Sequence, residues 1–283
     1  MPNRVAVGVA AVALVAVSAV TAPTGAHGRP PRSALVPNTM AFIDRRHGVL
    51  GTGWEGCVNR AFHCRPQGTL SLTADGGKTW RIVLRTSRPV VAVWFFHDVF
   101  NARLDNGRML WSDSAARRWR RGTQLAFNGY CPKGWQPGVS ADFLDPNLRP
   151  QWSVCTGPPA AGNEAKAVYR GTRRVAFTPI GGKSRGGISL YGYPLGIAGS
   201  YGGFGIIWES RGTLYVTQDG GSYWNALPKI ARPEIDFGDW ANADVYPHGT
   251  AFVLLSIGGS ERRRLIETTD AGRTWRVVHR WAG

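Results

Sequence analysis

The sequence predicts an all-β fold, a β-propeller built from four-stranded antiparallel blades. Three observations predict it: an eight-residue turn motif recurs, its copies keep a regular spacing, and short apolar runs precede each copy. The aspartates of two successive copies, Asp219 and Asp270, lie 51 positions apart. A repeat of roughly 40 to 50 residues with four strands is typical of propeller blades, because one such meander cannot bury both of its faces alone.

The turn motif, which we call the box, has three well-preserved copies: Thr73–Trp80 (TADGGKTW), Thr217–Trp224 (TQDGGSYW) and Thr268–Trp275 (TTDAGRTW). Its recurring residues are Asp75, Gly77, Trp80, Asp219, Gly221, Trp224, Asp270, Gly272 and Trp275. The aspartate is suited to accept backbone N–H groups of a tight turn, and glycine supplies positive φ. The tryptophan is expected to pack between blades. We therefore expect the box to be structural and not catalytic.

The distance between the first two boxes predicts two worn copies. Asp75 and Asp219 lie 144 positions apart, close to three repeats. One worn copy is Ser112–Trp119, in which Ser114 replaces the aspartate and Ala116 the glycine. A weaker copy lies around Tyr169–Phe177 (YRGTRRVAF), without its aspartate.

Each repeat is expected to open with an apolar first strand and to carry its box between the third and fourth strands. The expected first strands are Thr39–Ile43, Val90–Phe95, Ser140–Leu144, Ile188–Tyr193 and Ala243–Tyr246. Expected second strands include Val49–Trp54, Phe204–Glu209 and Ala251–Ile257. These repeats predict five blades, or six if Asp236–Trp240 begins a short extra blade.

The chain divides into three predicted parts. Residues 1–26, a basic start followed by an apolar run, are typical of a secretory signal peptide, with an uncleaved membrane anchor as the alternative. Residues 27–37 form a linker, in which Ser33–Pro37 is expected to close the ring by pairing with the last blade. Residues 38–283 form the propeller, which has no second membrane-spanning segment. We expect a protein that is secreted or associated with the cell envelope.

The four cysteines are Cys57, Cys64, Cys131 and Cys155. An even number in an exported chain favours two disulfides, which we expect to be Cys57–Cys64 and Cys131–Cys155. A zinc site is the alternative, but no second close cysteine pair or histidine pair completes a ligand pattern. No glycine-rich loop leads into a helix, so no nucleotide site is indicated. We expect neither a metal nor another cofactor.

The formal net charge is +16, and a charge of this size attracts anions. An anionic polymer, a glycan or an acidic protein partner would fit, whereas no motif indicates specific recognition of nucleic acid. The competing interpretation is an arginine-rich composition without function. The densest basic run, Arg117–Arg121, lies in an expected strand whose side chains alternate, so a solvated strand edge is favoured there over a single patch.

The loops opposite the boxes are the expected binding face. They contain all four cysteines and mix aromatic with basic side chains, which suit sugars, phosphates or acidic peptides. The candidate binding residues are Trp54, Arg60, Arg65, Tyr130, Lys133, Trp135, Lys183, Arg185, Lys229 and Arg232. For any single one of them, ordinary surface charge is the competing interpretation.

The three boxes resemble the Asp-box (BNR) repeats of the sialidase-like propeller superfamily, and they are also similar to photosystem-assembly and sortilin-type propellers. The resemblance covers most of residues 38–281 and implies a propeller fold. Its members include hydrolases, lectin-like modules and protein-binding scaffolds. The Phe/Tyr-Arg-Ile-Pro motif of sialidases is missing, so no catalytic residue is carried over. The resemblance favours a non-catalytic binding propeller, with a diverged sialidase-like exo-glycoside hydrolase as the alternative.

Overall fold

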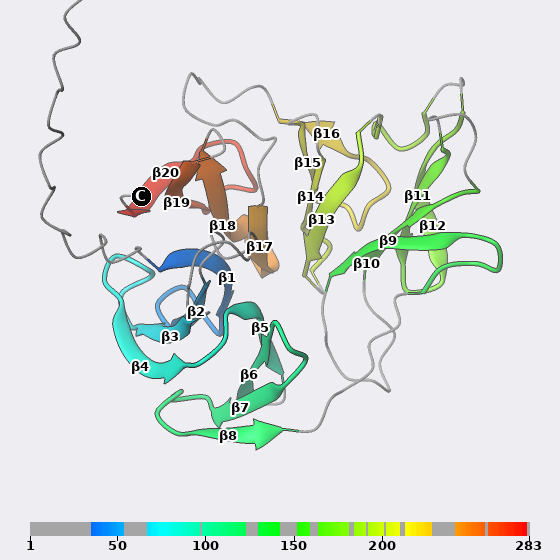
Figure 1. The fold of residues 1–283 in the computed structure, drawn as a ribbon. Helices are drawn as coiled ribbons and strands as arrows, with labels where there is room; N and C mark the ends of the chain where they lie inside the picture. The colour runs from blue at the N-terminus through cyan, green and yellow to red at the C-terminus, as the bar shows by residue number, and fades with distance from the viewer. Residues whose placement is uncertain are drawn as a thin grey trace, which may run out of the picture. The chain divides into compact units, whose positions relative to one another are not determined.

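The computed structural model describes residues 35–53, 67–96, 98–122, 130–141, 152–158, 164–180, 184–190, 192–200, 202–209, 213–227, 241–257 and 260–281. These residues form five sheets, each an antiparallel meander of four strands (Figure 1). Apart from the single 3-10 turn Pro247–Gly249, the described residues contain no helix. The fold is a β-propeller of five blades, as the repeats predict.

The strands of each blade follow one another directly in the sequence. Blade one holds β1 (Val36–Phe42), β2 (Gly48–Gly53), β3 (Gly68–Thr73) and β4 (Arg81–Thr86). Blade two holds β5 (Val90–Phe96), β6 (Val99–Leu104), β7 (Met109–Asp113) and β8 (Trp119–Gly122). Blade three holds β9 (Gln136–Ala141), β10 (Trp152–Thr156), β11 (Lys166–Arg170) and β12 (Arg173–Thr178).

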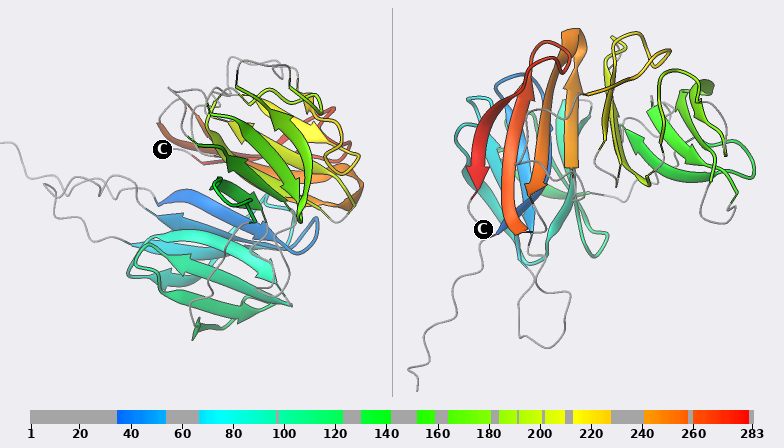
Figure 2. Two further views of the ribbon diagram at one scale, coloured as in Figure 1. Left: turned by 90° about the vertical axis from the view of Figure 1, so that its right-hand side faces the viewer. Right: turned by 90° about the horizontal axis from the view of Figure 1, so that it is seen from above.

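Blade four holds β13 (Pro194–Gly199), β14 (Gly205–Glu209), β15 (Leu214–Thr217) and β16 (Asn225–Ala226). Blade five holds β17 (Ala241–Tyr246), β18 (Thr250–Ile257), β19 (Ser260–Thr268) and β20 (Arg276–Trp281), seen as neighbouring orange and red strands in Figure 2. The three boxes lie between the third and fourth strands of blades one, four and five, as expected. The worn copy Ser112–Trp119 lies at the equivalent turn of blade two, whereas the stretch Tyr169–Phe177 forms the short β11–β12 hairpin of blade three.

The core lies between the faces of neighbouring blades, because each sheet has apolar side chains on both faces. Separate apolar clusters join blades one and two, three and four, four and five, and five and one. First strands pack against first strands: β1 contacts β5 and β17, and β13 contacts β9 and β17. The fourth strands form the opposite, outer edge of every sheet.

The expected closing strand is wrong for the residues that the structure describes. Val36 and Pro37 belong to β1, where they pair with Gly53 and Thr52. Ser33 lies outside the described residues. Blade five joins blade one through side chains instead: the Phe42 ring stacks on Phe252 at 4.1 Å between centroids. A separate strand is unnecessary because this blade already has four strands of its own.

The first strand of blade four also differs from the expectation. The apolar residues Ile188 and Leu190 are buried, but they lie in an unpaired segment, and the Leu190 N–H donates to Thr178 Oγ1 at 3.2 Å. The strand is the glycine-rich Pro194–Gly199. A Cβ at Gly196 would lie 1.8 Å from Trp208 Cζ2, so only glycine lets this strand approach the indole ring.

The first strand of blade three, expected at Ser140–Leu144, begins earlier, at Gln136. Its register pairs Gln136 with Thr156 and Pro137 with Cys155. Residues 142–144, and Asp236–Trp240 of the suggested sixth blade, lie outside the described residues. Backbone pairing with β10 sets the first residue of this strand. The apolar pattern, from which the strand was predicted, does not indicate where that pairing begins.

Candidate functional site

Four of the candidate binding residues lie in the described part of the chain: Tyr130, Lys133, Trp135 and Arg185. All four lie at blade three. The other candidates, and the expected Cys57–Cys64 disulfide, lie outside the described residues: Trp54, Arg60, Arg65, Lys183, Lys229 and Arg232. The site is therefore built from the segment 130–135, which precedes β9, and from the sheet against which it packs.

The Cys131–Cys155 disulfide is present, as predicted, and joins the segment 130–135 to β10. The two Cα atoms are 5.7 Å apart and the cysteines are separated by 24 positions. Cys155 is fully buried in the sheet. In the chain-entropy view, a cross-link that closes a loop of this length stabilises the folded state by about 3 kcal/mol.

Tyr130 fixes the beginning of the segment. Its carbonyl oxygen accepts a hydrogen bond from Ser153 Oγ at 2.9 Å. Its ring meets Tyr169 edge-on, with the centroids 5.6 Å apart. Burial raises the pKa of Tyr169, whereas the nearby Arg174 acts to lower it. Tyr130 is therefore partly buried against the sheet, so much of its ring is a packing surface.

A tight turn presents Lys133. The Trp135 N–H donates to the Pro132 carbonyl oxygen at 3.0 Å, and Gly134 takes a φ of +84°. Glycine suits this left-handed position, and Lys133 is left exposed at the tip of the turn. The backbone around Lys133 is thus fixed by the Cys131–Cys155 disulfide before it and by the Trp135–Pro132 hydrogen bond across the turn.

Phe177 connects the remaining two candidates. The Trp135 ring lies 6.3 Å from the Phe177 ring between centroids. The Phe177 backbone forms an isolated bridge with Arg185, with hydrogen bonds of 3.2 and 2.8 Å. The Arg174 guanidinium also lies over the Phe177 ring, 4.8 Å from its centroid. We call Tyr130, Lys133, Trp135, Phe177 and Arg185 the stapled platform.

Sequence reasoning missed Phe177 and Arg174. Both belong to the stretch interpreted as a worn box, but Arg170 and Arg173 pair directly across a short turn. The register shows that this stretch is an ordinary hairpin, with Phe177 on the same face as Ala167 and Cys155. Simple alternation along β12 could not have indicated Phe177, because the register shifts at Val175. Val175 packs against the core between blades three and four, whereas Phe177 packs against Cys155 and Ala167.

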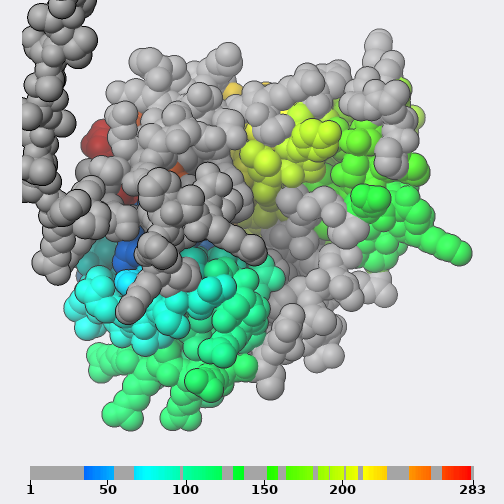
Figure 3. Space-filling view, viewed as in Figure 1, coloured from blue at the N-terminus to red at the C-terminus, as the bar shows by residue number. Residues whose placement is uncertain are grey.

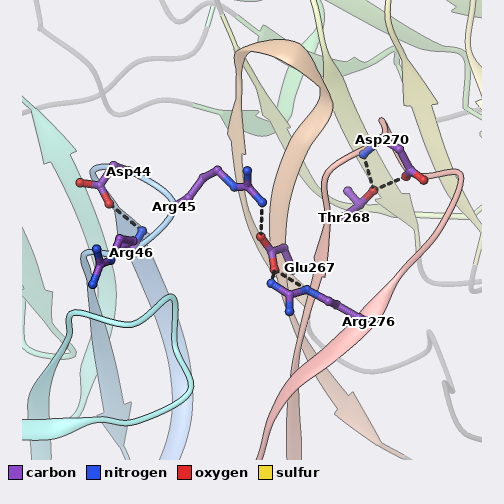
Figure 4. Close-up of polar contacts among 7 residues, drawn as sticks. All are labelled: Asp44, Arg45, Arg46, Glu267, Thr268, Asp270 and Arg276. Atoms are coloured by element: carbon purple, nitrogen blue, oxygen red, sulfur yellow. Dashed lines mark hydrogen bonds and ion pairs between the residues drawn. The ribbon is translucent and has the colours of Figure 1, made fainter.

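The box side of the fold carries a different kind of site, a buried carboxylate. Glu267 is 3% exposed and accepts hydrogen bonds from the Arg276 guanidinium, with its Nε at 2.8 Å (Figure 4). Arg45 of blade one also reaches Glu267, at 3.5 Å. Nearby, Thr268 Oγ1 donates to Asp270 at 2.9 Å. The ion pair between Arg45 and Glu267 joins blades one and five.

A second carboxylate, Asp244, lies at the same junction. Its Oδ2 accepts the Phe42 N–H at 2.5 Å and the Tyr246 hydroxyl at 3.0 Å. Asn242 accepts the Met40 N–H in the same way, at 3.1 Å. Desolvation by burial raises the pKa of Asp244 to about 6. The contacts satisfy backbone N–H groups on the inner edge of β1, so their role is structural.

The described residues contain no group of three histidine, cysteine or acidic side chains placed to hold a metal ion. Within the same residues, no helix is long and apolar enough to cross a membrane. The platform combines exposed cations with partly buried rings, an arrangement that suits binding of anionic or sugar groups.

No protein-family model and no curated protein matches the chain. Among solved structures it is similar to YCF48 bound to D1 peptide, at 15% identity over 87% of this chain and 82% of that one, with a TM-score of 0.37. It is also similar to the Aleuria aurantia lectin in complex with alpha-methyl-L-fucoside, at 10% identity over 86% and 94%, with a TM-score of 0.48. These likenesses concern the propeller fold and not the function.

A third similar structure is the GH74 xyloglucanase from Xanthomonas campestris. The identity is 14% over 85% of this chain and 38% of that one, with a TM-score of 0.30. The chain therefore spans less than half the length of this enzyme.

Proposed function

We propose that this protein is a non-catalytic binding propeller that uses the stapled platform to bind an anionic polymer, glycan or protein partner. The carrying observation is the disulfide Cys131–Cys155, which fixes the segment 130–135 on blade three. Lys133 and Arg185 are the exposed cations of the platform. A loop that is already ordered loses less conformational entropy when a partner binds.

Export and membership of the Asp-box superfamily are parts of the same proposal. The disulfide supports an oxidising location, and residues 1–26 would be the signal peptide. The three boxes support the superfamily, because each repeats one hydrogen-bond pattern between its threonine, aspartate and glycine. The basic composition, with a net charge of +16, supports an anionic partner.

The test compares charge reversal at the platform with charge reversal elsewhere. Purified protein would be titrated with poly-L-glutamate and with heparin, using biolayer interferometry. The variant Lys133→Glu with Arg185→Glu is expected to bind at least about tenfold more weakly, because two attractions become repulsions. The matched control, Arg103→Glu with Arg108→Glu, changes the net charge equally on blade two and should lose far less.

Equal losses in both variants, or no loss in either, would contradict a role for the platform. A larger variant that also reverses Lys183, Lys229 and Arg232 extends the test to the rest of the predicted face. All variants should keep the melting temperature of the parent, since the substituted described positions are exposed.

The enzymatic alternative is tested separately. A panel of fluorogenic sialosides and other glycosides should show no turnover by the purified protein. Turnover of any of them above a buffer control would contradict a purely binding role.

A further inference from the structure

In this propeller arginine is frequent in the outer strands of the blades and missing from the inner strands. The outer strands β4, β8, β12 and β20 each carry two arginines and no acidic residue. The eight residues are Arg81, Arg85, Arg120, Arg121, Arg173, Arg174, Arg276 and Arg280. The inner strands β1, β5, β9, β13 and β17 contain no lysine or arginine. Only β16, a strand of two residues, lacks the outer pair.

These side chains are available to a partner. All eight are exposed, and β4 and β8 lie along the surface of Figure 3 in cyan and green. Arg276 is held by Glu267. Within the described residues none of the other seven forms an ion pair with a carboxylate, so their charge is not neutralised there.

Two of the arginines are placed on aromatic rings. The Arg120 guanidinium lies over Trp111 at 5.4 Å from the ring centroid, and that of Arg174 lies over Phe177 at 4.8 Å. A stacked guanidinium uses its flat face for the ring and keeps the N–H donors of its edge free. Those donors match two oxygens of a phosphate or sulfate group at once.

The arrangement favours a flexible chain over a flat or rigid partner. Neighbouring residues of a strand point to opposite faces, so Arg120 and Arg121 project to different sides of β8, as Arg173 and Arg174 do on β12. A flat bilayer or a straight duplex meets one side of a sheet edge. A flexible polymer can follow both sides and pass from one edge to another.

We propose that the outer strands β4, β8, β12 and β20 form a binding surface for a flexible linear polymer of phosphate or sulfate groups. The surface meets the stapled platform at one residue, Arg174, whose guanidinium lies over Phe177. Arg81, Arg85, Arg120 and Arg121 of blades one and two are not part of the platform, so their variants test this surface independently of the function proposed above.

Positive charge on an outer strand can also have a protective role, and the test has to distinguish this role from polymer binding. An edge strand with unpaired N–H and C=O groups can pair with another chain, and charged side chains block this. If blocking were the only role, substitution would promote self-association and leave polymer binding unchanged.

The experiment titrates purified protein with inorganic polyphosphate, long-chain against tripolyphosphate, and with heparin as the sulfated chain. Three variants neutralise one outer pair each: Arg81→Gln with Arg85→Gln, Arg120→Gln with Arg121→Gln, and Arg173→Gln with Arg174→Gln. Each should weaken long-chain binding by about three- to tenfold and reduce the slope of log Kd against log salt by roughly 1.4. Tripolyphosphate should bind far more weakly than the long chain.

The control carries an equal charge change away from the outer strands and the platform: Arg103→Gln with Arg108→Gln on blade two. It should lose far less binding than the outer-pair variants. Sedimentation velocity at the same concentrations checks that every variant remains unaggregated. A loss as large in this control would overturn the proposal in favour of diffuse charge. It would also be overturned by unchanged binding in the outer-pair variants, or by tighter binding of duplex DNA or anionic vesicles than of the flexible chains.

Discussion

The intact boxes and the equivalent turn of blade two connect a third strand to a fourth strand, but different hydrogen bonds stabilise them. In each intact box the threonine hydroxyl donates to the aspartate and accepts the N–H of the second glycine position, at 2.8 to 3.0 Å. In blade two Ser112 Oγ donates instead to the Arg118 carbonyl oxygen, at 2.7 Å. Ser114 stands at the position that the aspartate occupies in the intact boxes.

One contact is common to all four turns. The indole N–H donates to the carbonyl oxygen three positions earlier, at 2.9 to 3.1 Å: Trp80 to Gly77, Trp119 to Ala116, Trp224 to Gly221 and Trp275 to Gly272. The accepting residue has positive φ in every case, even in Ala116, with a φ of +50°. The turn shape and the tryptophan anchor therefore persist without the aspartate, which adds hydrogen bonds to a turn already formed.

If the tryptophan is the main anchor, its loss should have the largest effect. Trp224 is fully buried and meets Trp152 edge-on at 5.7 Å between centroids. We expect Trp224→Ala to lower the free energy of unfolding by about 3–5 kcal/mol, measured by urea denaturation. Trp119→Ala, at the partly exposed equivalent in blade two, should cost less. Equal costs would show that burial does not set the contribution of this residue.

Asp244 differs from the box carboxylates because its pKa is raised, whereas theirs are lowered. We expect its substitution to have the next largest effect on stability. Its pKa is raised from 3.8 to about 6, so the folded protein holds a proton that the unfolded chain releases. Stability should therefore fall as the pH rises from about 4 to 6. Asp244→Asn removes the charge and keeps an oxygen for the Phe42 N–H. The variant should be more stable than the parent at pH 8, by about 2 kcal/mol, but not at pH 4.

The urea midpoints of the two proteins across pH 4 to 8 give the comparison directly. A parent stability that rises over this range, without a crossing of the two curves, would show that Asp244 does not control it.

The box aspartates should show the opposite pH dependence and a smaller effect. Hydrogen bonds from Thr274 hold the pKa of Asp270 at about 2. Burial acts to raise the pKa of Asp75, but hydrogen bonds from Thr79 and Thr73 lower it to about 2. Their stabilisation is present above pH 4 and is lost as the pH falls towards 2. Asp75→Asn and Asp270→Asn should each cost about 1 kcal/mol at pH 7, because solvent screens these turns.

The same substitutions measured at pH 2 provide the control. There about half of each parent carboxylate population is protonated, so the difference from each asparagine variant should shrink to a small fraction of its value at pH 7. A loss that stays constant with pH would mean that the carboxylate charge is not involved.

The smallest expected effect is a gain at the worn turn. Ala116 occupies the left-handed region that glycine adopts in the intact boxes. Ala116→Gly should therefore raise the free energy of unfolding by about 0.5–1 kcal/mol. Ala115→Gly, one position earlier, is the matched control, since Ala115 is not among the residues with positive φ. A loss at position 116 would show that the Ala116 methyl group contributes more by packing than it costs in backbone strain.

Much of the site was not predictable from the sequence because its residues act through partners that are distant in the chain. Lys133 and Trp135 were identified by their type, but Phe177, which lies between Trp135 and Arg185, belongs to a stretch interpreted as a worn box. Asp244 likewise belongs to no motif in the sequence. Its role depends on β1, which lies 202 positions earlier.

The sequence by itself determined the features that form within a few residues: the box turns, their place between third and fourth strands, and the number of blades. Each box is stabilised by hydrogen bonds between residues two to four positions apart, so a short motif contains its full cause. The tertiary structure alone decided that Ile188 and Leu190 lie in an unpaired segment and that Pro194–Gly199 forms the strand. It also decided that blade five meets blade one through Phe252 and Asp244 instead of a closing strand. In both cases the outcome depends on how closely two blades approach, and that distance is set by side chains far apart in the chain.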